Sequence, residues 1–326
     1  MATASAALFD SGKGGGAAVG EREDLSNVIA QIDPSEVPIY SMAKKGTAKA
    51  VFAEWQYQDL ASAASDNYVN EGADANYASP TPTVRVGNYM QISQKAVSIS
   101  ETLEAVDKAG RAKETAYQKI LKGKELKLDI NKSLGIDQAR AGSDPRKSAG
   151  LSSWITNVSV SAAGTASSAA TGDGTDVPSL TGTDRALTLA LIDEAMQAAY
   201  EDGGNPSAMV LSPTNKVNFS DLSSGSVAQN EYTMSSVKEG AIIGSVSLYL
   251  TDFGKLEVVI DRNLASDRIF LLDKAHMEVC TLPGRNFSVK PMGRTGDSTQ
   301  FQMVTEWTLK VPAPKAHGAV FDLSGS

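Results

Sequence analysis

Two stretches of alternating apolar and polar residues, separated by a long polar segment, constrain the fold of this chain most. Residues 47–60 place Val51, Trp55 and Tyr57 on one face, and residues 83–99 alternate in the same way. About twenty mostly polar residues lie between them. This pattern predicts an extended β-hairpin with a long tip. Because a two-stranded ribbon is only marginally stable in water, we expect the hairpin to lie on another surface, in particular on a second subunit.

A long helix is predicted after the hairpin, within residues 101–141. Gly110 separates a short helix from a long one that runs from about 111 to 140. A helix of about 30 residues would be about 45 Å long, which suits a structural strut better than an enzyme core. The predicted apolar stripe has helical spacing and consists of Tyr117, Ile120, Leu121, Leu128 and Leu134.

The remaining segments predict an irregular N-terminus and a C-terminal half rich in strands. Residues 1–20 are dominated by Ala, Gly and Ser, and they predict a flexible arm that becomes ordered only against a partner. Residues 25–46 predict two short helices separated by a proline turn, and the low-complexity segment 159–183 predicts a loop or linker that splits the chain. The other predicted elements are a helix over 183–202 capped by Thr183, a strand over 208–212, a helix that begins at Pro213, and strands over 241–251, 256–261, 268–272, 275–282, 287–292 and 299–311.

Composition excludes several classes of protein. The chain has 326 residues, a formal net charge of −8, one cysteine and two histidines. An acidic protein is a poor binder of nucleic acid over its whole surface, and a single cysteine cannot form an internal disulfide. Two histidines exclude a His-rich metal site within one chain. The sequence contains no run of 18 apolar residues, which a membrane-spanning helix would need. It has no N-terminal basic start followed by an apolar run, as a secretory signal would have. We also expect no metal or cofactor.

The charges are unevenly distributed. The segment from Asp107 to Lys147 contains eleven basic and six acidic residues, so it carries +5 and the remainder of the chain −13. The hairpin tip, residues 57–80, contains acidic residues and neither lysine nor arginine. Two interpretations stay open: both surfaces are simply solvated, or an acidic tip lies across the basic helix of a neighbour and steers assembly. The candidate subunit contacts are Trp55, Asp59, Asp66, Glu71, Asp74, Lys119, Lys122 and Lys127.

Three short motifs could carry chemistry, and each has a simpler interpretation. Asp252-Phe253-Gly254 matches a magnesium-binding tripeptide of kinases, but the His-Arg-Asp loop that a kinase needs is absent; we predict a hairpin turn. The glycine cluster 12–16 lacks the preceding strand of a dinucleotide-binding motif. His276, Glu278 and Cys280 could share one face of a strand, and a thiol–imidazole pair is the basis of an alternative function as a soluble enzyme.

The order of these parts resembles the major capsid protein of tailed phages with the Hong Kong 97-type fold, and within it the SU-ten-type major head proteins. Three stretches carry the likeness: DPSEVPIYSMAKKGTAKAVFAEWQYQDL, TDFGKLEVVIDRNL followed by RIFLLDKAHMEV, and GRTGDSTQFQMVTEWTLKVPAPKAHGAVFDL. The resemblance extends over residues 22–323 by order and local pattern, although the 159–183 segment has no counterpart in the family that we can name.

The resemblance implies an α+β fold divided into five parts. These are an N-arm with short helices (1–46), an extended hairpin loop (47–98), a peripheral domain with a spine helix and the low-complexity loop (99–182), an axial domain (183–290), and a return to the peripheral domain with the C-terminal segment (291–326).

The resemblance further implies a structural protein of the virion, not an enzyme, that is assembled in the host cytoplasm. Hexamers and pentamers would form an icosahedral head shell around the genome. The implied partners are other copies of the chain, a portal protein, a separate scaffold or decoration protein, and packaged DNA contacted non-specifically, with no membrane. Some members cross-link neighbouring subunits through a lysine of the extended loop; the tip here has none, since Lys49 and Lys95 lie only near its base. The alternatives are an encapsulin-like compartment, the soluble enzyme, and a fibre or adhesin protein.

Overall fold

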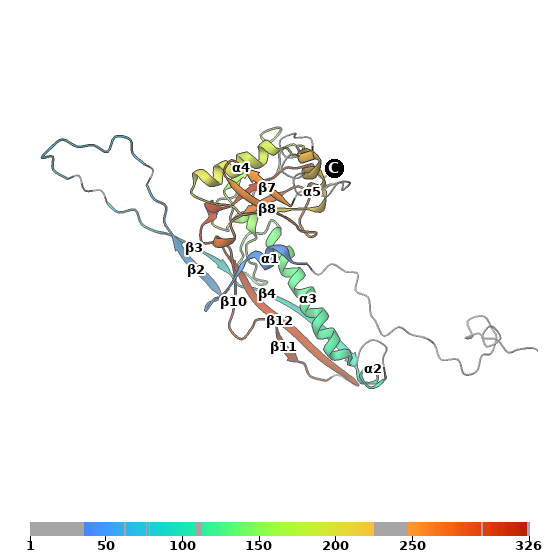
Figure 1. Cartoon of the computed structure of the whole chain (residues 1–326). Coiled ribbons are helices and arrows are strands. Elements are labelled where there is room, and N and C mark those ends of the chain that lie inside the picture. The colour runs from blue at the N-terminus through green and yellow to red at the C-terminus, as the bar shows by residue number, and fades with distance from the viewer. Residues whose placement is uncertain are drawn as a thin grey trace, which may run out of the picture.

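The computed structural model describes residues 36–324, except 62, 76, 78, 108–112, 225–246 and 295. Two β-sheets and one long helix build the body, and a two-stranded hairpin projects from it (Figure 1). This arrangement confirms the predicted α+β class. The predicted arm and the first short helix lie outside the described residues. The helices are α1 (Pro38–Met42), α2 (Glu101–Ala105), α3 (Glu114–Gly135), α4 (Leu189–Glu201) and α5 (Pro213–Ser224).

A five-stranded sheet forms the elongated part of the body. Its longest strand, β12 (Ser298–Lys310), pairs antiparallel with β4 (Gln91–Ser100) along the whole of β4. On its other side β12 pairs with β10 (Glu278–Thr281) and β11 (Ser288–Pro291), and β1 (Lys44–Thr47) adds to β10 in parallel. The predicted return strand over 299–311 is thereby confirmed as the centre of this sheet.

A six-stranded sheet forms the other part of the body, in the order β5-β13-β9-β6-β8-β7. Its central strands, β6 and β9, are buried at every residue, because elements cover both of their faces. Helix α4 packs against β5 and β13, and α5 packs against β6. The strands are β5 (Asn157–Ser159), β6 (Ala208–Leu211), β7 (Leu248–Thr251), β8 (Gly254–Ile260), β9 (Ile269–Leu272) and β13 (Gly318–Val320).

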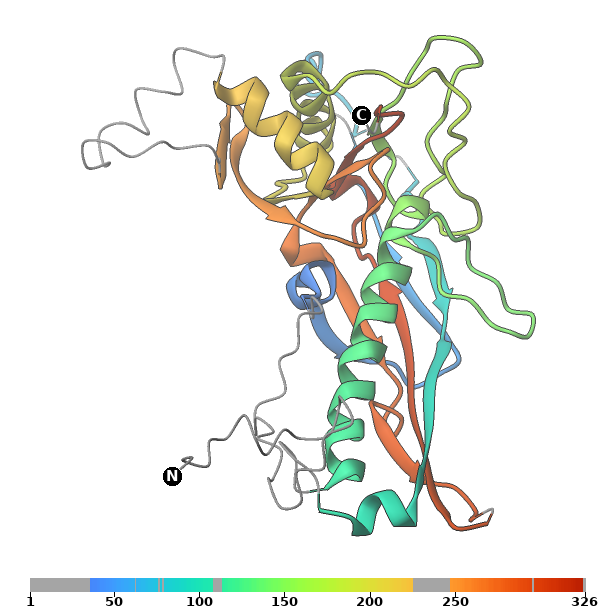
Figure 2. The same cartoon turned by 90° about the vertical axis from the view of Figure 1, so that its right-hand side faces the viewer.

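Helix α3 lies along the five-stranded sheet, against β4 and β12 (Figure 2). It has 22 residues, which makes it about 33 Å long, shorter than the predicted helix over 111–140. Its fully buried stripe is Leu126, Ile130 and Leu134, at a spacing of four residues. Ile120, which the sequence placed in the stripe, is 62 % exposed, so the fully buried apolar stripe is confined to the second half of the helix.

The C-terminus of α3 is set by tertiary contacts that periodicity does not report. The chain leaves helical geometry at Ile136, whose carbonyl accepts a hydrogen bond from the Ser152 hydroxyl at 3.3 Å. Gly150 packs directly over that carbonyl, where a Cβ would lie 2.3 Å from the oxygen. The segment after the helix therefore folds back over its last turn and ends it.

The predicted second strand of the hairpin, 83–99, is two strands that serve different sheets. Strand β3 (Val84–Tyr89) pairs with β2 (Phe52–Tyr57), whereas β4 pairs with β12. The break falls at Met90, whose side chain is fully buried beside Ala48 and Cys280. The alternating pattern continues across this point, so periodicity alone could not locate the change of partner.

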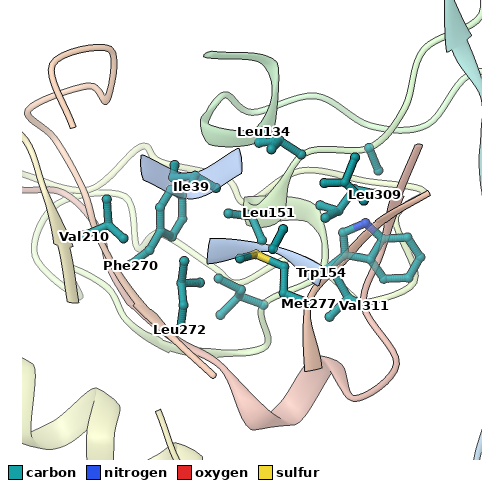
Figure 3. Close-up of a cluster of buried hydrophobic side chains, with 14 of the residues drawn as sticks. Ile39, Leu134, Leu151, Trp154, Val210, Phe270, Leu272, Met277, Leu309 and Val311 are labelled. Carbon is teal, nitrogen blue, oxygen red and sulfur yellow. The ribbon is translucent and has the colours of Figure 1, made fainter. Parts of the chain in front are cut away.

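One hydrophobic core joins both sheets, α3 and the hairpin (Figure 3). Leu134 comes from α3, Phe270 from β9 and Leu309 from β12, and all three are completely buried. Trp154, in the segment after a 3-10 turn at Leu151–Ser153, is completely buried in this cluster, near Leu309 and Val311. Since the two sheets share one core, we expect them to unfold together.

The low-complexity segment is a folded loop and not a linker. Two isolated β-bridges close it, between Gly164 and Gly182 and between Ser168 and Ser179. The Asp322 carboxylate accepts hydrogen bonds from two residues of the loop, the backbone N–H of Ser161 at 2.9 Å and the hydroxyl of Ser167 at 3.1 Å. These contacts tie the loop to the C-terminal segment, so it does not split the chain.

Two further element boundaries differ from the predictions. Helix α4 begins after Thr188 and not after Thr183, because the backbone and guanidinium of Arg185 are held by Asp322 and Ser159. The strand predicted over 275–282 begins only at Glu278, after a 3-10 turn at Lys274–His276. Strands β10 and β11 pair with β12 in the five-stranded sheet.

Candidate assembly surfaces

The base of the hairpin is built into the chain's own core. Trp55 on β2 is only 9 % exposed, and its ring lies 5.1 Å from that of Trp154. Its indole N–H donates to the carbonyl of Val311 at 3.0 Å. Sequence analysis proposed Trp55 as a subunit contact; the structure instead places it inside its own subunit, because the alternation of β2 turns this face toward the core.

Two polar side chains, Asn88 and Arg140, fix the second strand of the hairpin. The side chain of Asn88 is fully buried and donates to the carbonyl of Leu309 at 2.8 Å, while its oxygen accepts from the backbone of Ala149 at 2.9 Å. The guanidinium of Arg140 donates to the carbonyl of Gly87 and lies 5.4 Å from the ring of Phe52. The direction in which the hairpin leaves the body is therefore determined by its own subunit.

The hairpin from residue 58 to residue 83, which includes nearly all of the predicted tip, is exposed and has no regular structure where it is described. Asp66, Glu71 and Asp74 are exposed in it, as predicted for an acidic tip. Asp59 lies nearer the base and forms an ion pair with Lys315 of the same chain at 2.7 Å. This pairing raises the pKa of Lys315, because the carboxylate hydrogen-bonds and attracts its ammonium group.

The tip also exposes large apolar side chains, which sequence analysis missed. Leu60, Tyr68, Val69 and Tyr77 are 97 %, 82 %, 83 % and 92 % exposed. They are scattered among polar residues without a periodic spacing, so no pattern in the sequence marks them as a surface. Their position on one projecting arm, however, makes them available to a second molecule.

The three candidate lysines of α3 differ in their surroundings. Lys122 forms an ion pair with Glu125 at 2.7 Å within the helix. Lys119 and Lys127 are exposed and lie 5.5 and 5.8 Å from the rings of Phe301 and Phe287. In its own chain the tip extends away from α3 (Figure 1). Any contact between the acidic tip and these lysines must therefore be made between two chains.

The residues proposed for thiol chemistry do not form a reactive pair. The pKa of the Cys280 thiol is raised to about 11, mainly by burial and also by the neighbouring Glu278 carboxylate, so the thiolate needed for attack is scarce at neutral pH. His276 lies on the preceding 3-10 turn, where its Nδ1 is 2.7 Å from Asp273. The described residues contain no group of three His, Cys, Asp or Glu side chains placed to hold a metal ion.

The tripeptide Asp252-Phe253-Gly254 is a tight turn, as predicted. Strands β7 and β8 pair antiparallel up to Thr251 opposite Gly254, so Asp252 and Phe253 form the connection. The ring of Phe253 packs 5.5 Å from that of Tyr200 on α4.

Among the helices of the described residues, none is long and apolar enough to cross a membrane.

Solved chains with this fold come from phage capsids and from an encapsulin complex. A chain of the cyanophage A-1(L) capsid matches with a TM-score of 0.59 and 13 % identity, over 93 % of this chain and 97 % of that one. A chain of the cyanophage P-SCSP1u capsid gives 0.58 and 12 %, over 99 % of each. A chain of the holo-SrpI encapsulin complex from Synechococcus elongatus PCC 7942 gives 0.58 and 10 %, over 100 % and 98 %. These identities show the fold alone, which is the Hong Kong 97-type fold of phage capsid proteins.

The sequence match is more specific than the fold. The model of the SU10 major capsid protein family matches residues 9–324, so the chain belongs to this family and is a structural protein of a phage virion. A major capsid protein from Escherichia phage Phieco32 is 36 % identical over 121 residues. That alignment spans 37 % of this chain and 34 % of the relative, so the chain matches about a third of the relative's length.

Proposed function

We propose that this chain self-assembles into hexamers and pentamers that close an icosahedral shell around the phage genome. The observation that carries the proposal is the hairpin, whose base is part of the chain's own core while its tip extends away without a partner strand (Figure 1). A ribbon of this kind is stabilised when a second surface covers it. Neighbouring copies provide that surface at every position of a closed shell.

The apolar side chains of the tip supply a driving force for this contact. Full burial of one large apolar side chain contributes roughly 1.5–3 kcal/mol, so covering Leu60, Tyr68 and Tyr77 would stabilise the contact by several kcal/mol before the entropy of ordering is subtracted. Each subunit both extends a tip and receives one, and the resulting multivalency stabilises a closed shell built from weak contacts.

Charge provides the orientation in this proposal. Asp66, Glu71 and Asp74 would lie near Lys119 and Lys127 of a neighbouring copy, which favours encounter in the correct register. Asp59 and Lys122 already have partners within their own chain, and Trp55 is buried in the core. The intermolecular pairing therefore rests on the outer acidic residues and on Lys119 and Lys127, which lie over aromatic rings in their own chain.

Charge reversal tests this pairing. We expect Glu71→Lys combined with Asp74→Lys to slow assembly, followed by light scattering and electron microscopy, and the defect should be largest at low salt. Adding Lys119→Glu and Lys127→Glu should restore part of the rate. A matched control reverses two exposed acids elsewhere, Asp184→Lys and Glu201→Lys, and should assemble normally. Assembly of the tip variant at the wild-type rate would refute the electrostatic pairing.

Electron microscopy of the purified chain, together with its size in solution, tests the shell itself. Closed polyhedral particles built of hexameric and pentameric units are the expected result. Co-purified DNA would support a phage head, whereas an enzyme cargo without DNA would support a compartment like that of the encapsulin complex. A chain that stays monomeric at high concentration, with crowding agents and with an added scaffold protein, would contradict the proposal. A portal protein and non-specifically contacted DNA are the further partners in this proposal.

The proposed role involves neither catalysis nor a covalent cross-link from the tip. The tip between Tyr57 and Pro82 has no lysine, so shells boiled in detergent should give one band near the monomer mass, and a ladder of bands would contradict this expectation. The raised pKa of Cys280 supports the absence of thiol chemistry. Particles formed by the variant His276→Asn with Cys280→Ser should be unchanged.

A further inference from the structure

A shallow apolar groove lies between α1 and the end of β8, where the described chain begins. Its volume is about 420 Å³, and one wall consists of Glu36, Val37, Pro38 and Ser41. The other wall is Val259 and Ile260, and Ile260 is 44 % exposed. Figure 1 shows α1 close to the part of the six-stranded sheet that carries β8. The candidate surfaces of the hairpin and α3 do not include this groove.

The two walls of the groove are held in place by a single buried side chain. The amide oxygen of Asn131, on α3, accepts from the backbone N–H of Tyr40 at 3.1 Å. Its amide nitrogen donates to the carboxylate of Asp261 at 2.7 Å, directly after Ile260. Asn131 is completely buried. The groove is therefore preformed, and a ligand would not have to assemble its walls.

The chain immediately before the groove has the sequence of an amphipathic helix. Residues 25–33 read LSNVIAQID, with Leu25, Val28, Ile29 and Ile32 at the spacing i, i+3, i+4, i+7. The opposite face would carry Asn27 and Gln31. Such a segment is a poor helix alone in water because it is short, and most helical stability comes from packing of its apolar face.

The covalent connection brings this segment to the groove. Only Pro34 and Ser35 separate Asp33 from Glu36, which is itself a wall residue, and three extended residues span about 10 Å. A tether of this length gives an effective concentration in the millimolar range or above. The same segment of a neighbouring copy would have to compete against that concentration.

We propose that residues 25–33 of the same chain form an amphipathic helix whose apolar stripe occupies the groove between α1 and β8. The N-terminal arm then leaves the subunit from this point, and not from α1. The docked helix contacts both α1 and the six-stranded sheet, so it adds to the connections that the core and Asn131 already make between them. This inference does not depend on shell formation, because the contact is made within one chain.

Disulfide trapping tests the contact and distinguishes its possible sources. We expect Ile29→Cys with Ile260→Cys, mildly oxidised, to form an intramolecular disulfide that migrates faster than the reduced monomer on a denaturing gel. The matched control, Asn27→Cys with Ile260→Cys, places the thiol on the polar face and should react at least about five-fold more slowly. The wild-type chain is the negative control. Its single thiol, that of Cys280, is buried, so it should form no disulfide.

Each other outcome would overturn the proposal. Multimeric bands, in subunits or in particles, would mean that the segment of a neighbouring copy occupies the groove. Equal rates for the two thiol positions would exclude a helix with a fixed apolar face, and no disulfide in either variant would leave the groove without this occupant.

Hydrogen exchange provides an independent measurement on the full chain. Amides of residues 25–33 should exchange at least about ten-fold more slowly than their intrinsic rates, and Ile260→Ser should abolish this protection. Amides of β6 serve as the internal control and should stay equally protected in the variant, which would show that the fold is intact. Protection of 25–33 that survives Ile260→Ser would contradict the proposal.

Discussion

Replacement of Trp55 distinguishes a residue of the subunit's own core from a contact between subunits. The side chain is almost fully buried, packs against Trp154 and donates to the Val311 carbonyl. Removing a buried tryptophan leaves a cavity and typically costs about 3–5 kcal/mol. We therefore expect Trp55→Ala to lower the free energy of unfolding of the isolated, unassembled subunit by about this amount.

A more conservative replacement separates the ring from its hydrogen bond. Trp55→Phe keeps most of the apolar contact but removes the indole N–H. The buried Val311 carbonyl then has no side-chain donor, and leaving such a group unsatisfied costs about 1–3 kcal/mol. The order of stability should therefore be wild type, then Trp55→Phe, then Trp55→Ala.

Urea unfolding of unassembled subunits, followed by circular dichroism, measures these differences by linear extrapolation. Tyr77→Ala is the matched control: its side chain is 92 % exposed on the tip, so it should leave stability within about 0.5 kcal/mol of wild type and weaken assembly instead. If Trp55→Ala behaved like this control, stable as a subunit but defective in assembly, the assignment of Trp55 to the subunit core would be refuted.

Three further predictions concern buried groups. Burial lowers the pKa of His317 from 6.5 to about 4. As the pH falls, the unfolded chain takes up this proton before the folded chain does, so the free energy of unfolding should fall by about 3 kcal/mol between pH 6.5 and pH 4. His317→Gln should flatten this part of the pH profile of unfolding. Gly87→Ala should destabilise the hairpin base by about 1–3 kcal/mol, because a Cβ would lie 2.8 Å from a backbone carbonyl oxygen, whereas Gly293→Ala, with nothing within 4 Å, should be neutral in the same denaturation assay. Arg268 is nearly buried and holds Asp137 through two guanidinium nitrogens, so Arg268→Lys should lower the urea midpoint markedly, and an unchanged midpoint would contradict this role.

The local spacing of apolar residues was sufficient to predict the strands that have a hydrogen-bonded partner strand on each side. Strand β12 and the buried strands β6 and β9 were predicted close to their observed bounds, because alternation or a short apolar run reports burial directly. The turn at Asp252-Phe253-Gly254 was predicted because the strands flanking it alternate and the other parts of a kinase are missing. The family followed from the order of these elements along the chain.

Periodicity could not report which neighbour a strand pairs with. The alternation from 83 to 99 is continuous, yet Met90 divides it between the hairpin and the five-stranded sheet. For the same reason Trp55 was assigned to an intermolecular surface: its face was recognised as apolar, but only the fold places Trp154 opposite it.

The charge pattern likewise predicted an acidic tip and a basic helix but not their partners. Only the tertiary structure shows that Asp59 is paired with Lys315 and Lys122 with Glu125. For this reason the proposed pairing between copies uses the outer acids and the other two lysines. The order of the low-complexity segment 159–183 could not be predicted from the sequence for a related reason. Its order comes from Asp322, more than a hundred residues away in sequence, and from glycines that approach Trp154 closely.

The sequence by itself therefore determined the class of fold, the order of its elements and the family, since these depend on local spacing and composition. The tertiary structure decided which polar and aromatic groups are already satisfied within one subunit, because that depends on contacts between residues far apart in the chain. Those contacts leave the tip of the hairpin, two lysines of α3 and the groove beside α1 as surfaces open to another segment or another copy.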